Sequence, residues 1–373
     1  MTDTVLLTLG RLPKCLDLAR GFRALGWRVV VAEPFGWHLA ATSRAVARCY
    51  RVTAPRENVA RYRADLQAVI DRERPALVLP VSEDIVHVAA LAESLPRGCR
   101  LFSPPAAQLA RLHDKLRFTQ TAAAQGLTVP DSAAAGTPAA ASIARAGRYV
   151  VKPRRGCSGA GLRFCAAGEA PPDGQDMLVQ ARIDGALRSS FAIVHGGRIV
   201  ASSLYRGRVF DGTVAVGFER VAMPDAIADW VTRFAAAEAY TGFLAFDFII
   251  DESGVPYAIE CNPRATSGLH FFAAPDLARA ITALPPKGTD HWHRRETRLQ
   301  QFYGCLTVAQ GCFGDWPAYR RTWGTILRAR DVSWSWRDPL PFLLMIFSAY
   351  PILRRAVTQR ISLGQAAMAD FMV

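Results

Sequence analysis

One stretch of the chain, residues 243–268, constrains its fold and chemistry more than any other. Two apolar runs, 243–250 and 255–261, flank the turn-forming cluster 251–254. Apolar runs on either side of a short polar, glycine-containing cluster are typical of two strands joined by a turn. The stretch therefore predicts a β-hairpin.

Three polar residues, Asp247, Glu260 and Asn262, interrupt this apolar hairpin. In an antiparallel pair, residues that face each other project to the same side of the sheet. A two-residue turn at Ser253 and Gly254 sets Asp247 opposite Glu260, and a four-residue turn also leaves the three polar residues on one face. A turn of odd length would split them, because a slip of one residue moves a side chain to the other face.

Two carboxylates and an amide oxygen in an apolar hairpin are costly unless a cation neutralises them. Oxygen ligands of this kind suit Mg²⁺, with Mn²⁺ as a substitute. Asp247, Glu260 and Asn262 are therefore the predicted metal ligands; the alternative is a half-solvated hairpin with ordinary surface acids. Arg264 favours the metal site, because a guanidinium next to the acids suits binding of a carboxylate or phosphoryl group.

The chain of 373 residues is long enough for two or three domains, and its composition is that of a globular protein. Its net charge of +13 comes from scattered basic residues that are almost all arginine. We expect solvated arginines and no nucleic-acid partner, because basic and aromatic residues do not interleave as they do in binders of single strands. Lysine is rare, so each lysine is informative: Lys14, Lys115, Lys152 and Lys287.

The eight cysteines form no Cys-x-x-Cys pair and no Cys/His cluster with zinc-like spacing. This pattern indicates isolated thiols, with neither a disulfide framework nor a structural zinc site. The first ten residues do not have the charged and long apolar segments of a signal peptide, so we expect a cytoplasmic protein.

The N-terminal region predicts a small parallel α/β domain. A strand at 4–10, a helix at 16–25 and a strand at 27–32 form a right-handed β-α-β unit. A third strand at 76–80 places Glu83 at the carboxyl end of the sheet, where such sheets bind ligands. Glu83 either contacts a substrate or belongs to a helix start capped by Ser82. Without a G-x-G-x-x-G motif, a nicotinamide or flavin site is poorly supported.

A second candidate site follows a predicted strand at 149–153. Lys152 lies at the end of this strand, and the small-residue loop 154–161 contains Gly156, Ser158 and Gly159. Glycines let backbone N–H groups close on an anion, and a compact ammonium supplies a point charge to phosphate oxygens. The pattern favours a phosphate-binding loop over a plain hairpin connection.

These motifs resemble the ATP-grasp superfamily of enzymes, which includes carboxylate-amine ligases and the large chain of carbamoyl-phosphate synthase. The series Asp247, Glu260-Cys-Asn262-Pro-Arg264 is similar to the metal-binding hairpin of that family. Lys152 and its loop are similar to the flexible loop that folds over the phosphates.

The resemblance extends to two further segments. Asp114-Lys115, followed by Gly-Leu-x-Val-Pro at 126–130, is similar to the segment that opens the catalytic fold, in which the lysine reaches a nucleotide phosphate. Residues 180–185 are similar to the segment that lines the adenine. One departure is visible: many members hold the ribose with a glutamate a few residues further on, whereas this chain has Leu187 and Arg188 there. Either Asp184 takes the place of the glutamate or the ribose is held loosely.

The resemblance implies an ATP-dependent ligase that activates a carboxylate as an acyl phosphate on Mg-ATP and joins it to an amine or another nucleophile. The implied cofactors are ATP and Mg²⁺, and the partners are small-molecule substrates, with a homodimer also open. The alternative is a nucleotide-binding regulatory or scaffold protein with little turnover. The implied catalytic residues are Arg264 and Lys152, and the implied nucleotide-binding residues are Lys115, Lys152, Gly156, Ser158, Gly159, Gln180, Ala181, Ile183 and Asp184.

The fold class that follows is α/β: an ATP-grasp fold over residues 104–290, α+β in character, preceded by a Rossmann-like parallel domain over 1–103 and followed by a helical extension over 291–373. Within the extension, residues 339–349 read PLPFLLMIFSA, a run too short and too broken by proline to cross a membrane. The favoured interpretation is a buried helix that packs on the catalytic domain. The alternatives are that residues 339–355 form a wall for a lipophilic substrate, a dimer contact or a membrane-surface patch.

Overall fold

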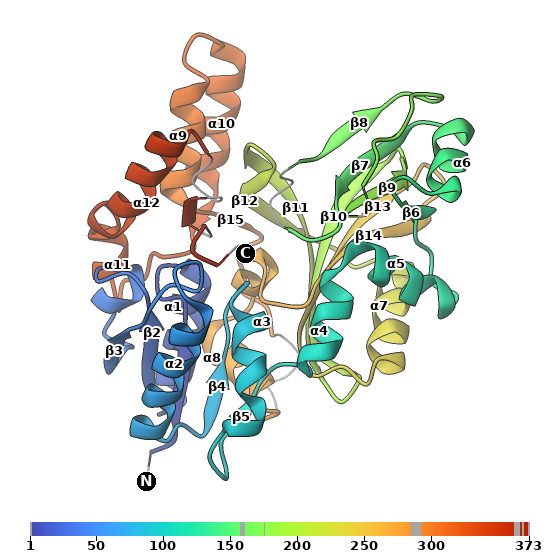
Figure 1. The fold of residues 1–373 in the computed structure, drawn as a ribbon. Helices are drawn as coiled ribbons and strands as arrows, with labels where there is room; N and C mark the ends of the chain where they lie inside the picture. The colour runs from blue at the N-terminus through green and yellow to red at the C-terminus, as the bar shows by residue number, and fades with distance from the viewer. Residues whose placement is uncertain are drawn as a thin grey trace. The chain divides into compact units, whose positions relative to one another are not determined.

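The computed structural model describes residues 2–156, 161–174, 176–284, 292–361, 366–367 and 369–371. The chain forms two compact units, each built from separate segments (Figure 1). The first unit comprises Met1–Ala106, Gly207–Val221 and Arg264–Val373, and the second comprises Ala107–Arg206 and Ala222–Pro263. Residues 291–373, expected as a separate extension, thus belong to the same unit as the N-terminal segment.

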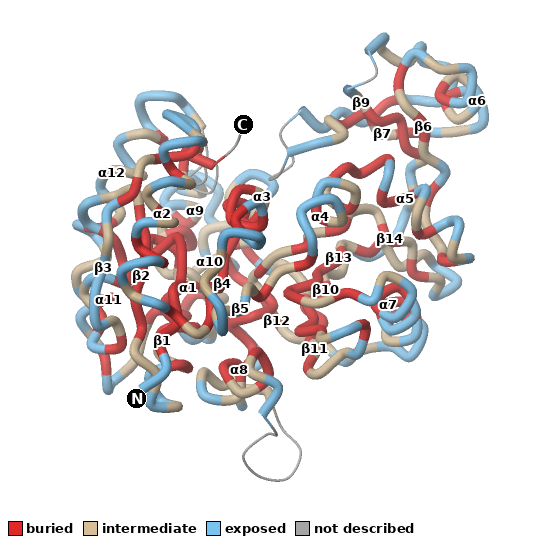
Figure 2. Tube along the Cα trace, turned by 60° about the horizontal axis from the view of Figure 1, so that its bottom comes forward, coloured by how far each residue is buried: buried red, intermediate tan, exposed pale blue. Residues whose placement is uncertain are grey.

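The first unit contains a parallel five-stranded sheet, as the N-terminal sequence predicts. The strand order is β3-β2-β1-β4-β5, and all four pairings are parallel. Strands β1 and β2 are buried almost throughout, which accounts for their unbroken apolar sequences (Figure 2). The elements of this segment are β1 (Thr4–Thr8), α1 (Pro13–Ala24), β2 (Arg28–Glu33), β3 (Arg48–Arg51), α2 (Val59–Glu73), β4 (Leu77–Leu79), α3 (Ile85–Val88) and β5 (Arg100–Leu101).

The remaining segments of the first unit add three strands and a group of helices. Strand β12 pairs antiparallel with β15, which pairs parallel with β16. Helix α8 packs against α1, and α10 against α9. These elements are β12 (Val214–Val221), α8 (Ala274–Ile281), β15 (Arg298–Gln300), α9 (Phe302–Gly311), α10 (Trp316–Arg328), β16 (Arg330–Asp331), α11 (Leu340–Leu343) and α12 (Met345–Gln359).

The prediction of a buried helix over residues 339–349 is wrong. The apolar run is divided at Leu344, which ends α11 and begins α12. Several of its large side chains face outward, including Leu343, Ile346 and Phe347. Among the described residues, no helix is both long and apolar enough to span a membrane.

The second unit begins with two helices and a four-stranded antiparallel sheet of order β6-β9-β7-β8. The two helices meet at Asp114, whose carboxylate accepts from the N–H groups of Leu116 and Arg117 and so caps the second helix. The elements are α4 (Ala106–His113), α5 (Lys115–Ala124), β6 (Ser132–Ala134), α6 (Pro138–Ala146), β7 (Tyr149–Pro153), β8 (Arg163–Cys165) and β9 (Met177–Ala181).

A second antiparallel sheet of this unit has the order β14-β13-β10-β11. An aromatic cluster packs helices α5 and α7 on β13: Trp230 of α7 lies 4.8 Å from Phe246 between ring centroids, and Phe118 of α5 lies 5.8 Å from the same ring. Aromatic burial of this kind fixes the strand that carries Asp247. The elements are β10 (Ala186–His195), β11 (Arg198–Asp211), α7 (Asp225–Ala237), β13 (Gly242–Ile250) and β14 (Pro256–Asn262).

Candidate active site

The hairpin β13–β14 has a turn of odd length and nevertheless keeps its polar residues together. Its strands end at Ile250 and begin again at Pro256, so residues 251–255 form the connection. The register Phe248 opposite Ala258 then changes to Asp247 opposite Glu260. A β-bulge at Ile259 therefore compensates for the odd turn, because one extra residue restores the side chains to the same face.

Asp247, Glu260 and Asn262 lie together on this face, as the sequence predicts. The side-chain amide of Asn262 donates to Asp247 Oδ2 at 3.1 Å. The other carboxylate oxygen, Asp247 Oδ1, accepts from the hydroxyl of Ser189 at 2.5 Å. Ser189 lies opposite Asp247 on β10 and holds the carboxylate in place. This contact could not be predicted from the sequence, because the pairing of β10 with β13 joins residues 58 apart in the chain.

Two lysines from different elements reach the same hairpin. Lys115, at the start of α5, has its Nζ 3.4 Å from Glu260 Oε1. Lys152, on β7, donates to the backbone carbonyl of the bulge residue Ile259 at 3.0 Å. Both side chains are buried, so their charges act with little screening by water. The structure thus brings Lys115, Lys152 and Glu260, which are far apart in the sequence, into one cluster.

The protonation of Lys152 is perturbed by this environment. Burial lowers the pKa of Lys152 to about 8, while the charges of Glu260 and Asp247 oppose this change and that of Lys115 adds to it. A lysine in such surroundings is a strong candidate for a functional group, because keeping its ammonium charged in a buried position costs free energy.

The start of the predicted phosphate loop is also held by this cluster. Lys115 Nζ donates to the carbonyl of Gly156 at 2.7 Å. Arg154, at the base of the loop, forms an ion pair with Asp114 at 2.7 Å, and its carbonyl accepts from the N–H of Lys115. Gly156 has φ of 126°, a conformation that favours glycine. Ser158 and Gly159 lie outside the residues that the structure describes.

The predicted adenine segment lies at the end of β9. Gln180 is buried and donates to Ser132, and the N–H of Ala181 donates to the carbonyl of Asp131. Ile183 follows, partly buried. Asp184 forms ion pairs with Arg148 and with Arg182, the latter at 3.0 Å. As a ribose ligand, Asp184 would have to share its carboxylate with two arginines.

Arg264 lies in the first unit, whereas the other predicted catalytic and metal residues lie in the second. Its Nε is 2.7 Å from Glu83 Oε1, and both side chains are largely buried. Lys14 donates to the hydroxyl of Ser82 and to the carbonyl of Ala265. Glu83 is thus the partner of Arg264, and the structure adds Lys14 to this cluster; the scarcity of lysine was the only sequence signal for it.

His270, just beyond Arg264, is a packed residue of the first unit. It is fully buried, and its Nδ1 lies 2.8 Å from Asp17 on α1. Asp17 also pairs with Arg294 at 2.7 Å. Burial by itself raises the pKa of Asp17, but Arg294 and the hydrogen bond with His270 bring it below its usual value. The triad ties three distant segments of the first unit together.

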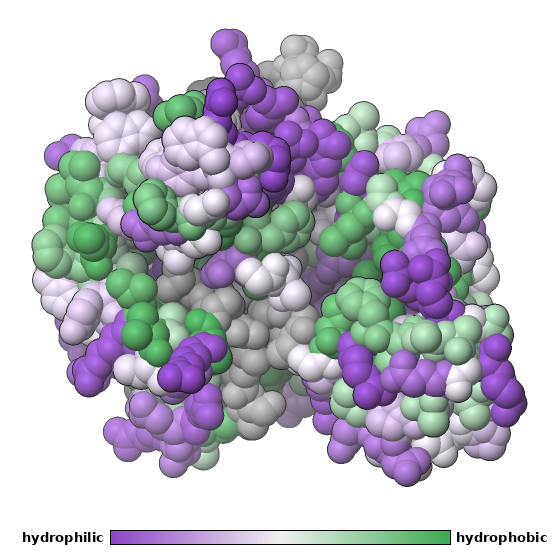
Figure 3. Space-filling model, turned by 90° about the horizontal axis from the view of Figure 1, so that it is seen from above, coloured by the Kyte–Doolittle hydropathy of each residue, from purple (hydrophilic) through white to green (hydrophobic). Residues whose placement is uncertain are grey.

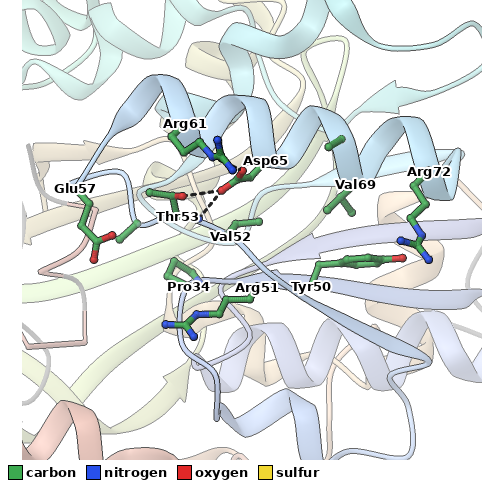
Figure 4. A pocket seen from close by; sticks show the side chains of 12 residues that line it. Pro34, Tyr50, Arg51, Val52, Thr53, Glu57, Arg61, Asp65, Val69 and Arg72 are labelled. Carbon is green, nitrogen blue, oxygen red and sulfur yellow. Dashed lines mark hydrogen bonds and ion pairs between the residues drawn. The ribbon is translucent and has the colours of Figure 1, made fainter.

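A pocket of about 580 Å³ in the first unit contains none of the predicted site residues (Figure 4). It lies beside α2 and β3, and its acid Asp65 already accepts from Thr53 and pairs with Arg61 at 3.0 Å. With Asp65 engaged and none of the predicted site residues in its lining, this pocket is a weaker candidate than the acidic hairpin.

The donor set of the hairpin fits a hard divalent cation. Within the described part of the chain, no three His, Cys, Asp or Glu side chains gather as a metal cluster. The hairpin offers two carboxylates and an amide oxygen, and an ion held by so few protein ligands must complete its shell with substrate oxygens and water, as Mg²⁺ commonly does. The adjacent ammonium groups suit an anionic substrate at the same place.

The profile of the ATP-grasp domain family matches residues 112–268, and no curated protein sequence matches the chain. A biotin carboxylase domain of Hydrogenobacter thermophilus 2-oxoglutarate carboxylase is 15% identical with a TM-score of 0.61, covering 79% of this chain and 73% of its own.

Two other solved structures have the same fold. N5-carboxyaminoimidazole synthetase from Staphylococcus aureus is 14% identical, covers 77% of this chain and 80% of its own, and has a TM-score of 0.59. L-amino acid ligase from Bacillus licheniformis is 15% identical, with 75% and 74% coverage and a TM-score of 0.57. Residues 112–268, which contain the acidic hairpin and the two buried lysines, thus match the ATP-grasp domain family, and the chain shares its fold with these solved structures.

Proposed function

We propose that this protein is an ATP-dependent ligase that forms an acyl bond, typically to nitrogen. The observation that carries the proposal is the convergence of Lys115, Lys152 and the carboxylates of β13–β14 within the second unit. Similar structures support it: one is a biotin carboxylase domain in complex with MgADP and bicarbonate, and another is an L-amino acid ligase.

In the proposed reaction, a carboxylate oxygen of the substrate attacks the γ-phosphorus of ATP, and ADP leaves. A nucleophile then attacks the acyl carbon of the resulting acyl phosphate, and phosphate leaves with the bonding electrons. Both steps need charge neutralisation and alignment more than covalent help from the protein.

Each residue has a distinct part in this proposal. Lys115 and Lys152 bind phosphate oxygens as compact point charges. Asp247, Glu260 and Asn262 would hold Mg²⁺, which when bound polarises the phosphoryl group and neutralises its charge. The amide of Asn262 and the hydroxyl of Ser189 orient Asp247.

Recognition of the acceptor carboxylate is assigned to the cluster of the first unit. Arg264 offers a planar guanidinium for bidentate binding, and Glu83 fixes its orientation at 2.7 Å. Lys14 adds a second positive charge to this cluster, through its hydrogen bond to Ala265 next to Arg264.

The experiment is to measure ADP release over a panel of carboxylates, including amino acids and bicarbonate, each with amines and with hydroxylamine. Hydroxylamine converts an acyl phosphate into a hydroxamate, so a hydroxamate that depends on one carboxylate identifies the activated acid. ATP binding without carboxylate-dependent ADP release across the panel, and without hydroxamate, would contradict the ligase proposal and leave a nucleotide-binding protein.

A further inference from the structure

Helices α11 and α12 present large apolar side chains to the outside. The most exposed of these define what we call the apolar face: Leu343, Ile346, Phe347, Tyr350, Leu353 and Val357. Their spacing of three or four residues places them along one side of a helix. In the view of Figure 3, apolar surface lies on the left flank, where Figure 1 draws α11 and α12, with strongly hydrophilic side chains beside it.

This orientation is the inverse of an ordinary surface helix. The buried positions of α12 are the small residues Ser348 and Ala356, whereas Phe347 is 64% exposed and Val357 is 69% exposed. A surface helix of a globular protein normally directs its large apolar residues inward. Continuous exposed apolar surface of this kind indicates an interaction site.

Polar contacts hold α11 and α12 at both ends, so the orientation of the apolar face is fixed within the first unit. Before α11, Asp338 accepts from Arg20 at 2.9 Å, from the hydroxyl of Ser43 at 2.6 Å and from the N–H of Arg44. In the last turns of α12, Arg355 pairs with Asp370 at 2.6 Å. All these groups belong to the first unit, and both acids are buried.

The exposed charged side chains of residues 336–361 are all positive. Arg337, Arg354 and Arg360 are exposed. The described acids of the same segment, Asp338 and Asp370, are buried in ion pairs with Arg20 and Arg11. The exposed Trp336 and Tyr350 add aromatic groups of the type that prefers a lipid–water interface.

We propose that the apolar face of α11–α12 lies on an anionic lipid surface, with its arginines at the phosphate groups and its apolar side chains among the acyl chains. The chemistry is that of an interfacial amphipathic helix. A second copy of the chain suits the face less well, because a two-fold contact brings identical patches together and would set arginines against arginines.

The test is co-sedimentation of the full chain with vesicles of phosphatidylglycerol and phosphatidylcholine, compared with vesicles of phosphatidylcholine alone. We expect binding to the anionic vesicles that weakens at least tenfold between about 0.1 M and about 0.5 M salt, because salt screens the arginine–phosphate attraction. The double substitution Ile346→Asp/Phe347→Asp should reduce binding at least tenfold. Since both side chains point outward, its thermal melting should match that of the wild type.

Phe164→Asp in the second unit is the matched control, because Phe164 is 62% exposed and so nearly equal to Phe347. It should bind vesicles like the wild type. Equal binding to neutral and anionic vesicles, absence of binding to both, or undiminished binding of the double variant would each overturn the proposal. Sedimentation velocity without lipid tests the oligomeric state. If the wild type does not bind vesicles and is a dimer, while the double variant is a monomer, the proposal is overturned and the face belongs to a contact with a second copy.

Discussion

The ammonium of Lys152 donates a 3.0 Å hydrogen bond to the backbone carbonyl of Ile259, the bulge residue of β14. A bulge leaves a backbone group outside the regular ladder, and here that group is the acceptor of a buried lysine. The same irregularity therefore serves two purposes: it turns Glu260 to the side of Asp247, and it anchors the ammonium next to both carboxylates.

The pH dependence of kcat/KM for ATP should show the titration of Lys152. Because burial lowers the pKa of Lys152 to about 8, kcat/KM for ATP should fall as the pH rises through about 8, where the free enzyme loses the ammonium. Lys152→Arg should keep its charge and lose this limb, yet remain far below wild-type activity, because a forked guanidinium does not replace a compact ammonium. Near-native kinetics of Lys152→Arg would contradict the assignment of Lys152 to phosphate binding.

Stability should depend on pH through the same residue. Lys152 has a folded-state pKa of about 8 against 10.5 for an ordinary lysine. Between these values the unfolded chain binds more protons, so the unfolding free energy of the wild type should rise with pH relative to Lys152→Met. Between these two pH values, the unfolding free energy of the wild type should rise by about 3 kcal/mol relative to that of Lys152→Met. Urea unfolding at several pH values measures this difference. A constant difference between the two proteins would show that Lys152 titrates normally.

Asp247→Asn and Glu260→Gln should each lower carboxylate-dependent ADP release at least about 100-fold, because each removes a charge that the metal requires. The apolar side of the hairpin is unchanged, so circular dichroism and melting should stay close to the wild type. Glu252→Gln is the matched control, since Glu252 is exposed in the turn of the same hairpin. Full activity of the double variant would remove the hairpin from the mechanism.

Asp17→Asn should destabilise the first unit by about 3 kcal/mol, because it leaves Arg294 and His270 without their buried anionic partner. The pKa of Asp17 is lowered, so its contribution is present above the ordinary pKa of 3.8 and is lost as the pH falls through the lowered value. Asp229→Asn is the control: Asp229 pairs with Arg233 on an exposed helix face, and the expected change is below about 0.5 kcal/mol. Equal urea midpoints for the two variants would contradict the role of the triad.

Much of the site could be predicted because its chemistry is local in the sequence. Asp247, Glu260 and Asn262 stand in apolar runs whose period determines their face, and Lys152 stands before a glycine loop. The bulge at Ile259 was not predictable, because nothing in the sequence of β14 distinguishes an extra residue from a regular one. Only the structure shows that the turn is odd and that the bulge corrects it.

The contacts that could not be predicted from the sequence join distant segments of the chain. Ser189 lies opposite Asp247 only because β10 pairs with β13, and Glu83 meets Arg264 through packing of segments 181 residues apart. The exposed apolar side of α12 was only an alternative to the favoured buried helix, for a different reason. Its periodicity is correct for a helix, but periodicity does not say which side of a helix faces the protein, and here small residues occupy the inner side.

The buried pair of Arg11 and Asp370 has a consequence for the order of events during synthesis. Arg11 emerges early and contacts Glu33, but its second anionic partner is 359 residues further along the chain. The second unit lies entirely between these points and is interrupted in sequence only by Gly207–Val221, so it can fold on the ribosome before the N-terminal sheet has made its last contacts. A ribosome stalled shortly before residue 370 should therefore carry a protease-resistant second unit and a protease-sensitive N-terminal sheet.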